Sequence, residues 1–355
     1  MDPEPDTSPM IVTPVQEIRA AADRGARTPA DLAVSLDAAD LMRRGVAANT
    51  TRAYTRCWAR FAAWCQHGPD RDGSPPWASR TALPATAATL LEYVAELVRA
   101  DKSPATVEQA IAAIRTHHRA AGFKDTPDTE AARLALRGYR KARAKQGLRP
   151  RKSPPITVEQ LRRMIEVCDP ATLAGKRDRV MLVLGYALYA RRCELSDLHI
   201  EDVEHSDQGL KVLIRASKTD RDALGEYVPI KAGQHPDTDP VALLRAWTDA
   251  LAALGVSGGY LLRAITRHGA LFPHGFMTGE AINERIRVIG LRAGLRDAHR
   301  LTAHGLRSGP ASTAAKRGSP LSAIAEQGRW SPNSPVVYGY IREADRWNQY
   351  PDIGL

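Results

Sequence analysis

Residues 304–342 read HGLRSGPASTAAKRGSPLSAIAEQGRWSPNSPVVYGYIR, and they are the most informative part of this 355-residue chain. Three short blocks stand out in them: His304 to Gly309, Gly328 to Ser331 and Tyr338 to Arg342. The segments between and after these blocks have helical periodicity, which predicts helices at 308–317, 321–327 and 335–343. The blocks themselves contain histidine, arginine, tryptophan and tyrosine, side chains that donate hydrogen bonds or exchange protons.

A fourth block lies upstream, at residues 185–198, GYALYARRCELSDL. Arg191 and Arg192 follow an apolar helical segment, where guanidinium groups are costly to desolvate unless an anion or a carboxylate meets them. A further basic residue, Lys218, lies in a polar loop between two short apolar runs near 212–214 and 227–230. These runs are typical of the two strands of a hairpin.

The rest of this half of the chain is expected to be helical, from Ile156 to the end. Thr157 and Gln160 have the spacing of a helix capping box. Further helices are predicted at 176–189, 194–198, 240–254 and 279–293. The pattern therefore predicts a domain at 156–355 that is mainly α with a small antiparallel β-sheet.

The first half of the chain predicts an all-helical domain at 28–142. Helices are expected at 51–67, 85–99, 103–121 and 129–143, and nothing before residue 140 alternates like a strand. One buried stripe is expected on the first of these helices, formed by Tyr54, Trp58, Phe61 and Cys65. Residues 1–27 are rich in Pro, Asp, Glu and Ala, which predicts a disordered leader.

Basic residues gather in two places in this half. One row on the first helix repeats every four residues and is either a solvated surface or a set of phosphate contacts. The other runs from 137 to 152, with eight basic and no acidic residues, and includes a proline-containing linker expected at 143–155. A linker that follows DNA phosphates would release counterions; a merely soluble tether is the alternative. The candidate DNA-binding residues are Arg52, Arg56, Arg60, Arg140, Lys141, Arg143, Lys145, Arg149, Arg151 and Lys152.

Composition narrows the possible functions. The net charge of +10 favours a polyanionic partner. The four cysteines lack metal-type spacing, which favours inert thiols in a reducing cytoplasm. The sequence has no GK[ST] phosphate loop and no HExxH motif, so neither a nucleotide cofactor nor a metal site is expected. No apolar run reaches the roughly 18 residues of a membrane span, so we expect a cytoplasmic, nucleoid-associated protein without a membrane partner.

Together the four blocks resemble those of the tyrosine recombinases, the phage integrase family, over nearly the whole second half. Asn49 to Tyr54 and the Trp/Phe helix that follows resemble the core-binding domain of that family. One block alone is a weak signal, but four blocks in the family's order are specific. The resemblance implies an all-helical core-binding domain followed by an α+β catalytic domain.

The resemblance also implies the roles of the site residues. Two arginines would bind the phosphate, a lysine would protonate the leaving group, and a tyrosine would attack. The implied catalytic set is Arg191, Lys218, His304, Arg307, Trp330 and Tyr340. Arg192 competes with Arg191 and Tyr338 with Tyr340. Glu194 either orients a charged neighbour or is only the ion-pair partner of a basic side chain.

The activity implied is cutting and rejoining of double-stranded DNA through a 3′-phosphotyrosine bond, with no cofactor. The implied assembly is a homotetramer on two DNA sites, in which the residues after Arg342 dock on a neighbour. Two alternatives remain. A type IB topoisomerase shares the chemistry, although His304 argues against it, and a DNA-binding protein of this fold could have lost catalysis.

Overall fold

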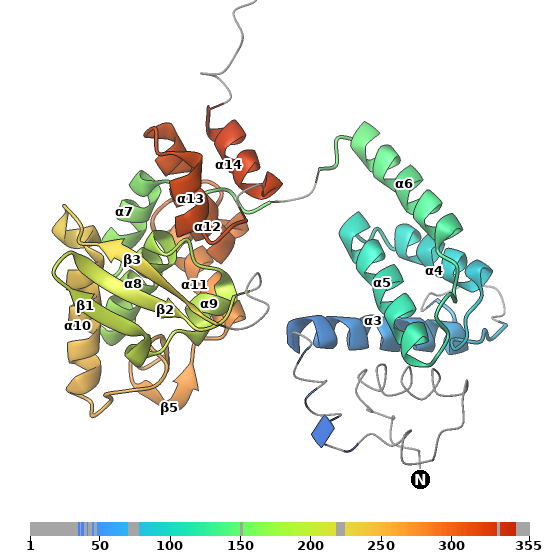
Figure 1. Cartoon of the computed structure of the whole chain (residues 1–355), viewed down its shortest axis with the longest axis horizontal. Coiled ribbons are helices and arrows are strands. Elements are labelled where there is room, and N and C mark those ends of the chain that lie inside the picture. The colour runs from blue at the N-terminus through green and yellow to red at the C-terminus, as the bar shows by residue number, and fades with distance from the viewer. Residues whose placement is uncertain are drawn as a thin grey trace, which may run out of the picture. The chain divides into compact units, whose positions relative to one another are not determined.

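A computed structural model of the chain describes residues 35, 37–38, 41, 45, 48–69, 78–149, 152–217, 224–331 and 334–345, without the side chains of 273–274 and 341–345 (Figure 1). The chain divides into two compact units, Met1–Pro150 and Arg151–Leu355, and the division falls inside the predicted linker. The predicted leader, Arg151, Lys218 and the tail after residue 345 lie outside the described residues.

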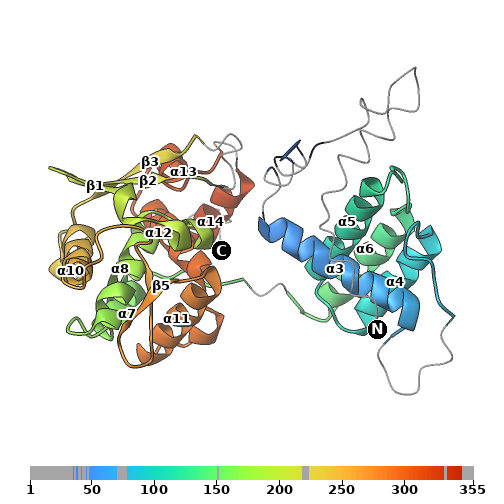
Figure 2. The same ribbon diagram turned by 90° about the horizontal axis from the view of Figure 1, so that it is seen from below.

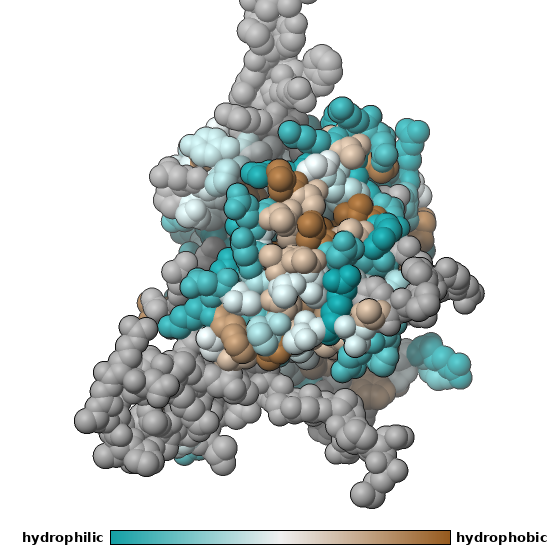
Figure 3. Space-filling model, turned by 90° about the vertical axis from the view of Figure 1, so that its right-hand side faces the viewer, coloured by the Kyte–Doolittle hydropathy of each residue, from teal (hydrophilic) through white to brown (hydrophobic). Residues whose placement is uncertain are grey.

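The first unit is helical throughout its described elements: α3 (Ala48–His67), α4 (Ala87–Arg99), α5 (Pro104–Ala120) and α6 (Glu130–Lys145). Helix α3 packs on α5, and α4 packs on α6. Phe61 and Cys65 of the predicted stripe are fully buried, whereas Trp58 is partly buried against this core. The face of the unit seen in Figure 3 has apolar residues in its centre and hydrophilic ones around them.

Helix α6 extends further than predicted. It runs to Lys145, so the first three residues of the predicted linker are helical. Arginine, lysine and alanine favour a helix, and Gly147, with φ of 72°, follows its end. The extended part of the connection therefore begins later than residue 143.

The second unit combines eight α-helices among its described residues with two small sheets. The helices are α7 (Val158–Glu166), α8 (Leu173–Ala187), α9 (Arg192–Asp197), α10 (Pro240–Ala252), α11 (Gly279–Arg292), α12 (Ala303–Lys316), α13 (Leu321–Gln327) and α14 (Pro335–Asp345). The predicted capping box at the start of α7 is confirmed, with Thr157 and Gln160 each bonded to the other's backbone. The mainly helical fold with antiparallel strands is confirmed as well.

The larger sheet contains β1 (Val203–Ser206), β2 (Gly209–Ile214) and β3 (Glu226–Lys231) in the order β1-β2-β3, all antiparallel. Its β2–β3 pair is the predicted hairpin, with Val212 opposite Val228. Figure 2 shows the sheet edge-on, as a thin layer along one side of the unit. A second sheet pairs β4 (Arg263–Ile265) with β5 (Leu271–Phe276). Strands β1, β4 and β5 were not predicted, because β1 is mostly exposed, β4 has only three residues, and β5 contains a proline and a glycine and lacks apolar alternation.

Helix α8 lies at the centre of this unit and is buried on nearly every side. It packs against α10 and α12. Trp247 of α10 is fully buried, and its indole N–H donates to the Leu261 carbonyl at 2.8 Å. A helix buried all round makes a rigid base, and the connection that contains Arg191 leaves from its end.

Helix α12 begins five residues earlier than predicted, at Ala303, with Thr302 as its N-cap. Glycine has a low helix propensity, so Gly305 concealed this start, whereas Gly309 lies inside the predicted range. They are needed for packing, because a Cβ on Gly309 would lie 1.9 Å from the Ile156 carbonyl oxygen. The Ile156 N–H donates to the Gly305 carbonyl at 3.0 Å. This close contact fixes the first turns of α12, which carry His304 and Arg307.

Candidate active site

The structure brings five of the six predicted catalytic residues into one cluster; the sixth, Lys218, lies outside the described residues. Helix α12 supplies His304 and Arg307, and α14 supplies Tyr340. Trp330 lies just after α13, and Arg191 caps the start of α9. Helices α12, α13 and α14 follow one another in the sequence, whereas α9 lies well before them. Trp330 and Tyr340 pack together against a small core that includes Tyr189 and Val337.

The tyrosine and the histidine form a direct pair. The Tyr340 phenol oxygen lies 2.9 Å from His304 Nε2. The centroids of the Tyr340 and Trp330 rings are 5.8 Å apart. Desolvation by surrounding atoms, then the charges of Arg307 and Lys152, lower the pKa of His304. The imidazole is therefore neutral near pH 7, and Nε2 can accept a proton from the phenol. The rival Tyr338 is 42% exposed, whereas the phenol oxygen within hydrogen-bond distance of His304 is that of Tyr340.

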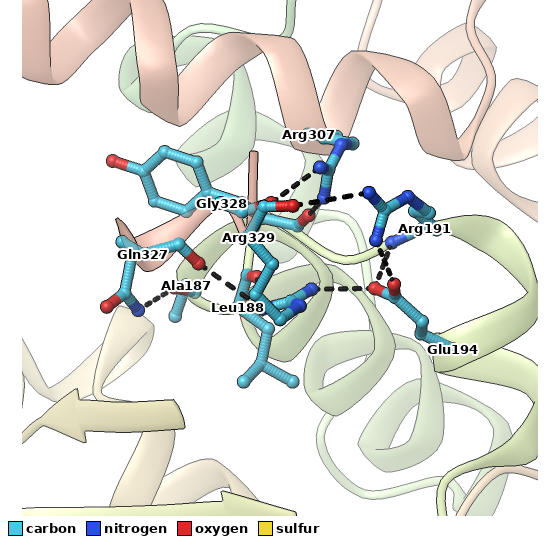
Figure 4. Close-up of polar contacts among 9 residues, drawn as sticks. Ala187, Leu188, Arg191, Glu194, Arg307, Gln327, Gly328 and Arg329 are labelled. Carbon is cyan, nitrogen blue, oxygen red and sulfur yellow. Dashed lines mark hydrogen bonds and ion pairs between the residues drawn. The ribbon is translucent and has the colours of Figure 1, made fainter. Parts of the chain in front are cut away.

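Arg307 is buried and held by backbone carbonyls (Figure 4). Its Nη1 donates to the Tyr189 carbonyl, and its Nη2 donates to the Gly328 carbonyl at 2.5 Å. The guanidinium lies 4.2 Å from the centre of the Trp330 ring, in cation–π contact. Burial, followed by the charge of Arg191, lowers the pKa of Arg307. A buried guanidinium whose charge is disfavoured by a neighbouring one makes a site that an anion would stabilise.

Arg191 belongs to the same cluster through Glu194. Its Nη1 lies 2.5 Å from Glu194 Oε1, and its backbone N–H donates to Oε2 at 2.8 Å. The competing Arg192 points elsewhere: its side chain is 42% exposed and pairs with Glu280 at 3.3 Å. The geometry therefore favours Arg191 over Arg192 as the arginine of this cluster.

Glu194 is buried between two arginines rather than one. Arg329, which the sequence analysis did not single out, places its Nη2 2.6 Å from Glu194 Oε2. Burial alone would raise the pKa of Glu194, but the charge of Arg329 and the hydrogen bonds from Arg191 outweigh it, and the pKa is lowered. The carboxylate is therefore ionised at neutral pH. The only signal for Arg329 in the sequence was a charged residue within the Gly-Arg-Trp block.

A cleft of about 1000 Å³ opens beside this cluster, within the second unit. Tyr340 and His304 are on its wall. Its basic lining residues are Lys152, Arg300, Lys316 and Arg317. Lys152 is one of the predicted DNA-binding residues, and the cleft gives a charged ligand access to the tyrosine.

The other predicted DNA-binding residues are mostly exposed. Arg52, Arg56 and Arg60 are exposed on α3, and Lys141, Lys145 and Arg149 are exposed in and after α6. Two more are engaged within the unit: Arg140 pairs with Glu108 at 2.7 Å, and Arg143 pairs with Asp101. Surface ion pairs of this kind are weak, so a phosphate could replace either carboxylate.

Neither a metal-type cluster nor a membrane-spanning helix occurs among the described residues. In that part of the chain no group of three or more His, Cys, Asp or Glu side chains is placed to hold a metal ion. No described helix has the length and apolar character needed to cross a membrane.

Comparison with known proteins gives the family. The profile of the phage integrase family matches residues 155–346. An integrase/recombinase XerD homologue of Selenomonas ruminantium is 29% identical over 323 residues, covering 91% of this chain and 89% of the relative. Recombinase Cre of Escherichia phage P1 is 21% identical over 304 residues, covering 80% of this chain and 81% of Cre.

Solved structures share the fold. The XerH site-specific recombinase bound to a palindromic difH substrate superimposes with a TM-score of 0.55 at 15% identity, covering 96% of each chain. A lambda integrase dimer bound to a COC′ core site gives a TM-score of 0.54 at 14% identity, covering 89% of this chain and 95% of the other.

A helix-rich chain with small antiparallel sheets, matching these relatives over most of its length, has the tyrosine recombinase fold. The chain belongs to the phage integrase family. It is therefore a protein of site-specific DNA recombination.

Proposed function

We propose that this protein cuts and rejoins double-stranded DNA at specific sites through a 3′-phosphotyrosine intermediate formed on Tyr340. The observation that carries the proposal is the 2.9 Å approach of the Tyr340 phenol oxygen to His304 Nε2, beside two arginines. A free tyrosine titrates near pH 10, so a nucleophilic phenol needs a proton acceptor and positive surroundings. Both are present in this cluster.

The reaction begins when the Tyr340 oxygen attacks the phosphorus of a backbone phosphodiester and passes its proton to His304 Nε2. The new Tyr–O–P bond forms as the bond to the deoxyribose 5′ oxygen breaks. Lys218 protonates that oxygen, since an alkoxide is a poor leaving group. Rejoining is the reverse: a 5′ hydroxyl attacks the phosphotyrosine, and the phenol leaves.

The two arginines bind the non-bridging phosphate oxygens during this exchange. The phosphate has one negative charge in the substrate and gains a second in the five-coordinate transition state. Arg191 and Arg307 are fork-shaped donors that match these oxygens, and preorganised charge of this kind is a large term in catalysis. The buried guanidinium of Arg307, close enough to Arg191 for that charge to lower its pKa, supports this role. Trp330 adds an indole N–H donor and a packing surface.

The partner proposed is duplex DNA. The relatives crystallised with a difH substrate and a COC′ core site are DNA complexes, and exposed basic residues occur in both units of this chain. We propose the corresponding domain organisation: a helical core-binding half, a basic connection, and a catalytic half that begins at residue 156. We also propose a homotetramer on two DNA sites, with the residues after Arg342 docking on a neighbouring copy.

The test uses the full chain and a pool of nicked duplexes with randomised sequence. A nick close to the scissile phosphate lets the short strand diffuse away, so a covalent complex accumulates and survives denaturation. We expect recovered sequences to converge on one site and Tyr340→Phe to abolish the complex, with Tyr338→Phe as the matched control. Covalent complexes on arbitrary DNA, together with relaxation of supercoiled DNA and no strand exchange, would indicate a topoisomerase. No complex at all would leave only DNA binding.

A further inference from the structure

We propose that Arg329 is a positioning residue: it neutralises Glu194 and holds the turn that aims Arg191 and Arg307 at the phosphate. The inference rests on the proposed function and adds to it a residue that the family resemblance did not supply.

Arg329 is almost completely enclosed, with 2% of its side chain exposed. Besides the 2.6 Å bond to Glu194, its Nη1 donates to the carbonyls of Leu188 at 3.0 Å and Gln327 at 3.2 Å (Figure 4). It therefore connects the end of α8, the end of α13 and the acidic residue of α9. These are the elements from which Arg191 and Trp330 project.

The backbone of the same residue faces both phosphate-binding candidates. The Arg329 carbonyl accepts from Arg191 Nη2 at 3.4 Å, and the preceding Gly328 carbonyl accepts from Arg307 Nη2 at 2.5 Å. Two adjacent peptide groups thus orient two guanidiniums. Gly328 cannot be replaced easily, because a Cβ there would lie 1.8 Å from the Trp330 ring.

This turn requires an unfavourable backbone conformation. Arg329 has φ of 54°, in the left-handed region that favours glycine. Only three non-glycine residues with positive φ occur among the described residues, and a second, Tyr189, supplies its carbonyl to Arg307 Nη1. Strain of this kind persists where the surrounding structure holds it, commonly at functional sites.

Charge gives the reason for an arginine here. Two buried guanidiniums, of Arg307 and Arg329, and the partly buried one of Arg191 lie near a single carboxylate, Glu194, which leaves two net positive charges. A phosphodiester that gains a second negative charge in the transition state matches that balance. Without Arg329, the Glu194 carboxylate would be neutralised by Arg191 alone, and the cluster would have one net positive charge for the phosphate instead of two.

A purely structural role explains the residue less well. An apolar pair of similar size is often as stabilising as a buried ion pair. The Arg329 Nε–H is also buried without an acceptor among the residues that the structure describes, which is a cost. The buried guanidinium of Arg329 therefore lowers the stability of the fold, and its positive charge explains its presence better than packing does.

The test measures single-turnover cleavage of a nicked duplex recovered from the pool, DNA affinity by gel shift, and thermal unfolding. We expect Arg329→Met to slow cleavage by about 100-fold while DNA affinity changes by less than about threefold. Adding Glu194→Gln to that variant restores two net positive charges, so we expect cleavage to recover by at least about tenfold. Arg329→Lys, which keeps the charge, should lose less than Arg329→Met.

Arg285→Met is the matched control, because Arg285 also pairs with a buried carboxylate, Asp178, at 2.5 Å. It should lower the unfolding temperature without slowing cleavage. If Arg329→Met does not fold, Arg329→Lys and the Glu194→Gln/Arg329→Met pair decide the question. Wild-type cleavage in folded Arg329→Met, or a folded double variant no faster than the single one, overturns the inference. Failure of the unmodified protein to form any adduct overturns the proposed function instead.

Discussion

The phenol oxygen of Tyr340 and Nε2 of His304 lie 2.9 Å apart, although 36 positions separate the two residues in the chain. Helices α12 and α14 make this approach possible, because they pack directly against each other. In the proposed mechanism this pair joins a nucleophile to a base, and the pKa of that base, His304, is held below its usual value.

Cleavage should depend on pH through His304. The pKa of His304 in the folded protein lies below the ordinary 6.5, so the imidazole stays neutral at pH 7. Its acceptor nitrogen becomes protonated, and can no longer take the proton of Tyr340, only as pH falls through that lowered pKa. The single-turnover rate should therefore be flat from pH 7 down to about 6.5 and decrease below it. His304→Gln should be slower by about 100-fold or more and lack this acidic limb. A wild-type rate that rises on acidification would contradict the assignment.

The two neighbouring arginines should behave differently. Arg191→Lys keeps the charge but loses the bidentate geometry, so cleavage should decrease by about 100-fold. Arg192→Lys alters an exposed pair with Glu280 and should change the rate less than about threefold. Single-turnover cleavage of the same nicked duplex separates the two. Equal decreases in the cleavage rate of the two variants would show that assigning Arg191, and not Arg192, to the phosphate site is wrong.

Gly309 should be required for packing of the site. A Cβ there would meet the Ile156 carbonyl at 1.9 Å, so Gly309→Ala must displace α12 from the start of the unit. We expect the free energy of unfolding to decrease by about 1–3 kcal/mol, as for other overpacked sites, and cleavage to decrease with it. Gly138→Ala in α6 is the control, because a Cβ there meets nothing within 4 Å. Denaturant titration measures both, and an unchanged midpoint for Gly309→Ala would argue against the packing described.

The first unit should lose stability in acid through His117. This ring stacks on Trp58 with centroids 3.6 Å apart, and burial, then the neighbouring His118, lowers its pKa to about 4. The unfolded chain takes up the proton near pH 6.5, so stability is complete above that pH and is lost as pH falls toward 4. Allowing for screening by solvent, the loss is about 1–2 kcal/mol. His117→Phe keeps the stacking without the titration, and a pH profile equal to the wild-type one would contradict the prediction.

Much of the fold follows from the sequence because the signals are local. The stripe ending at Phe61 and Cys65, the capping box at Thr157 and the hairpin at Val212 and Val228 all depend on neighbours along the chain. The start of α12 was missed because Gly305 matters for a contact with Ile156, which is distant in sequence. Strand β1 was missed because its side chains are mostly exposed.

The candidate site likewise combines residues that the sequence could indicate with one that only a long-range contact reveals. The resemblance supplied the residues that contact the phosphate in the proposed mechanism, and the structure groups the described ones. It could not supply Arg329, since the role of this side chain depends on a pairing with Glu194 across 135 positions. A long-range ion pair leaves no periodicity or spacing in one sequence. Only the folded chain reveals it.

Locating the protein–DNA bond tests the proposed mechanism most directly. The covalent complex from the nicked duplex is digested with protease and nuclease, and the peptide that retains a 3′-linked nucleotide is sequenced by mass spectrometry. We expect a single adduct, on the phenol oxygen of Tyr340. An adduct on Tyr338 or on any other residue, or cleaved DNA with no attached peptide, would contradict it.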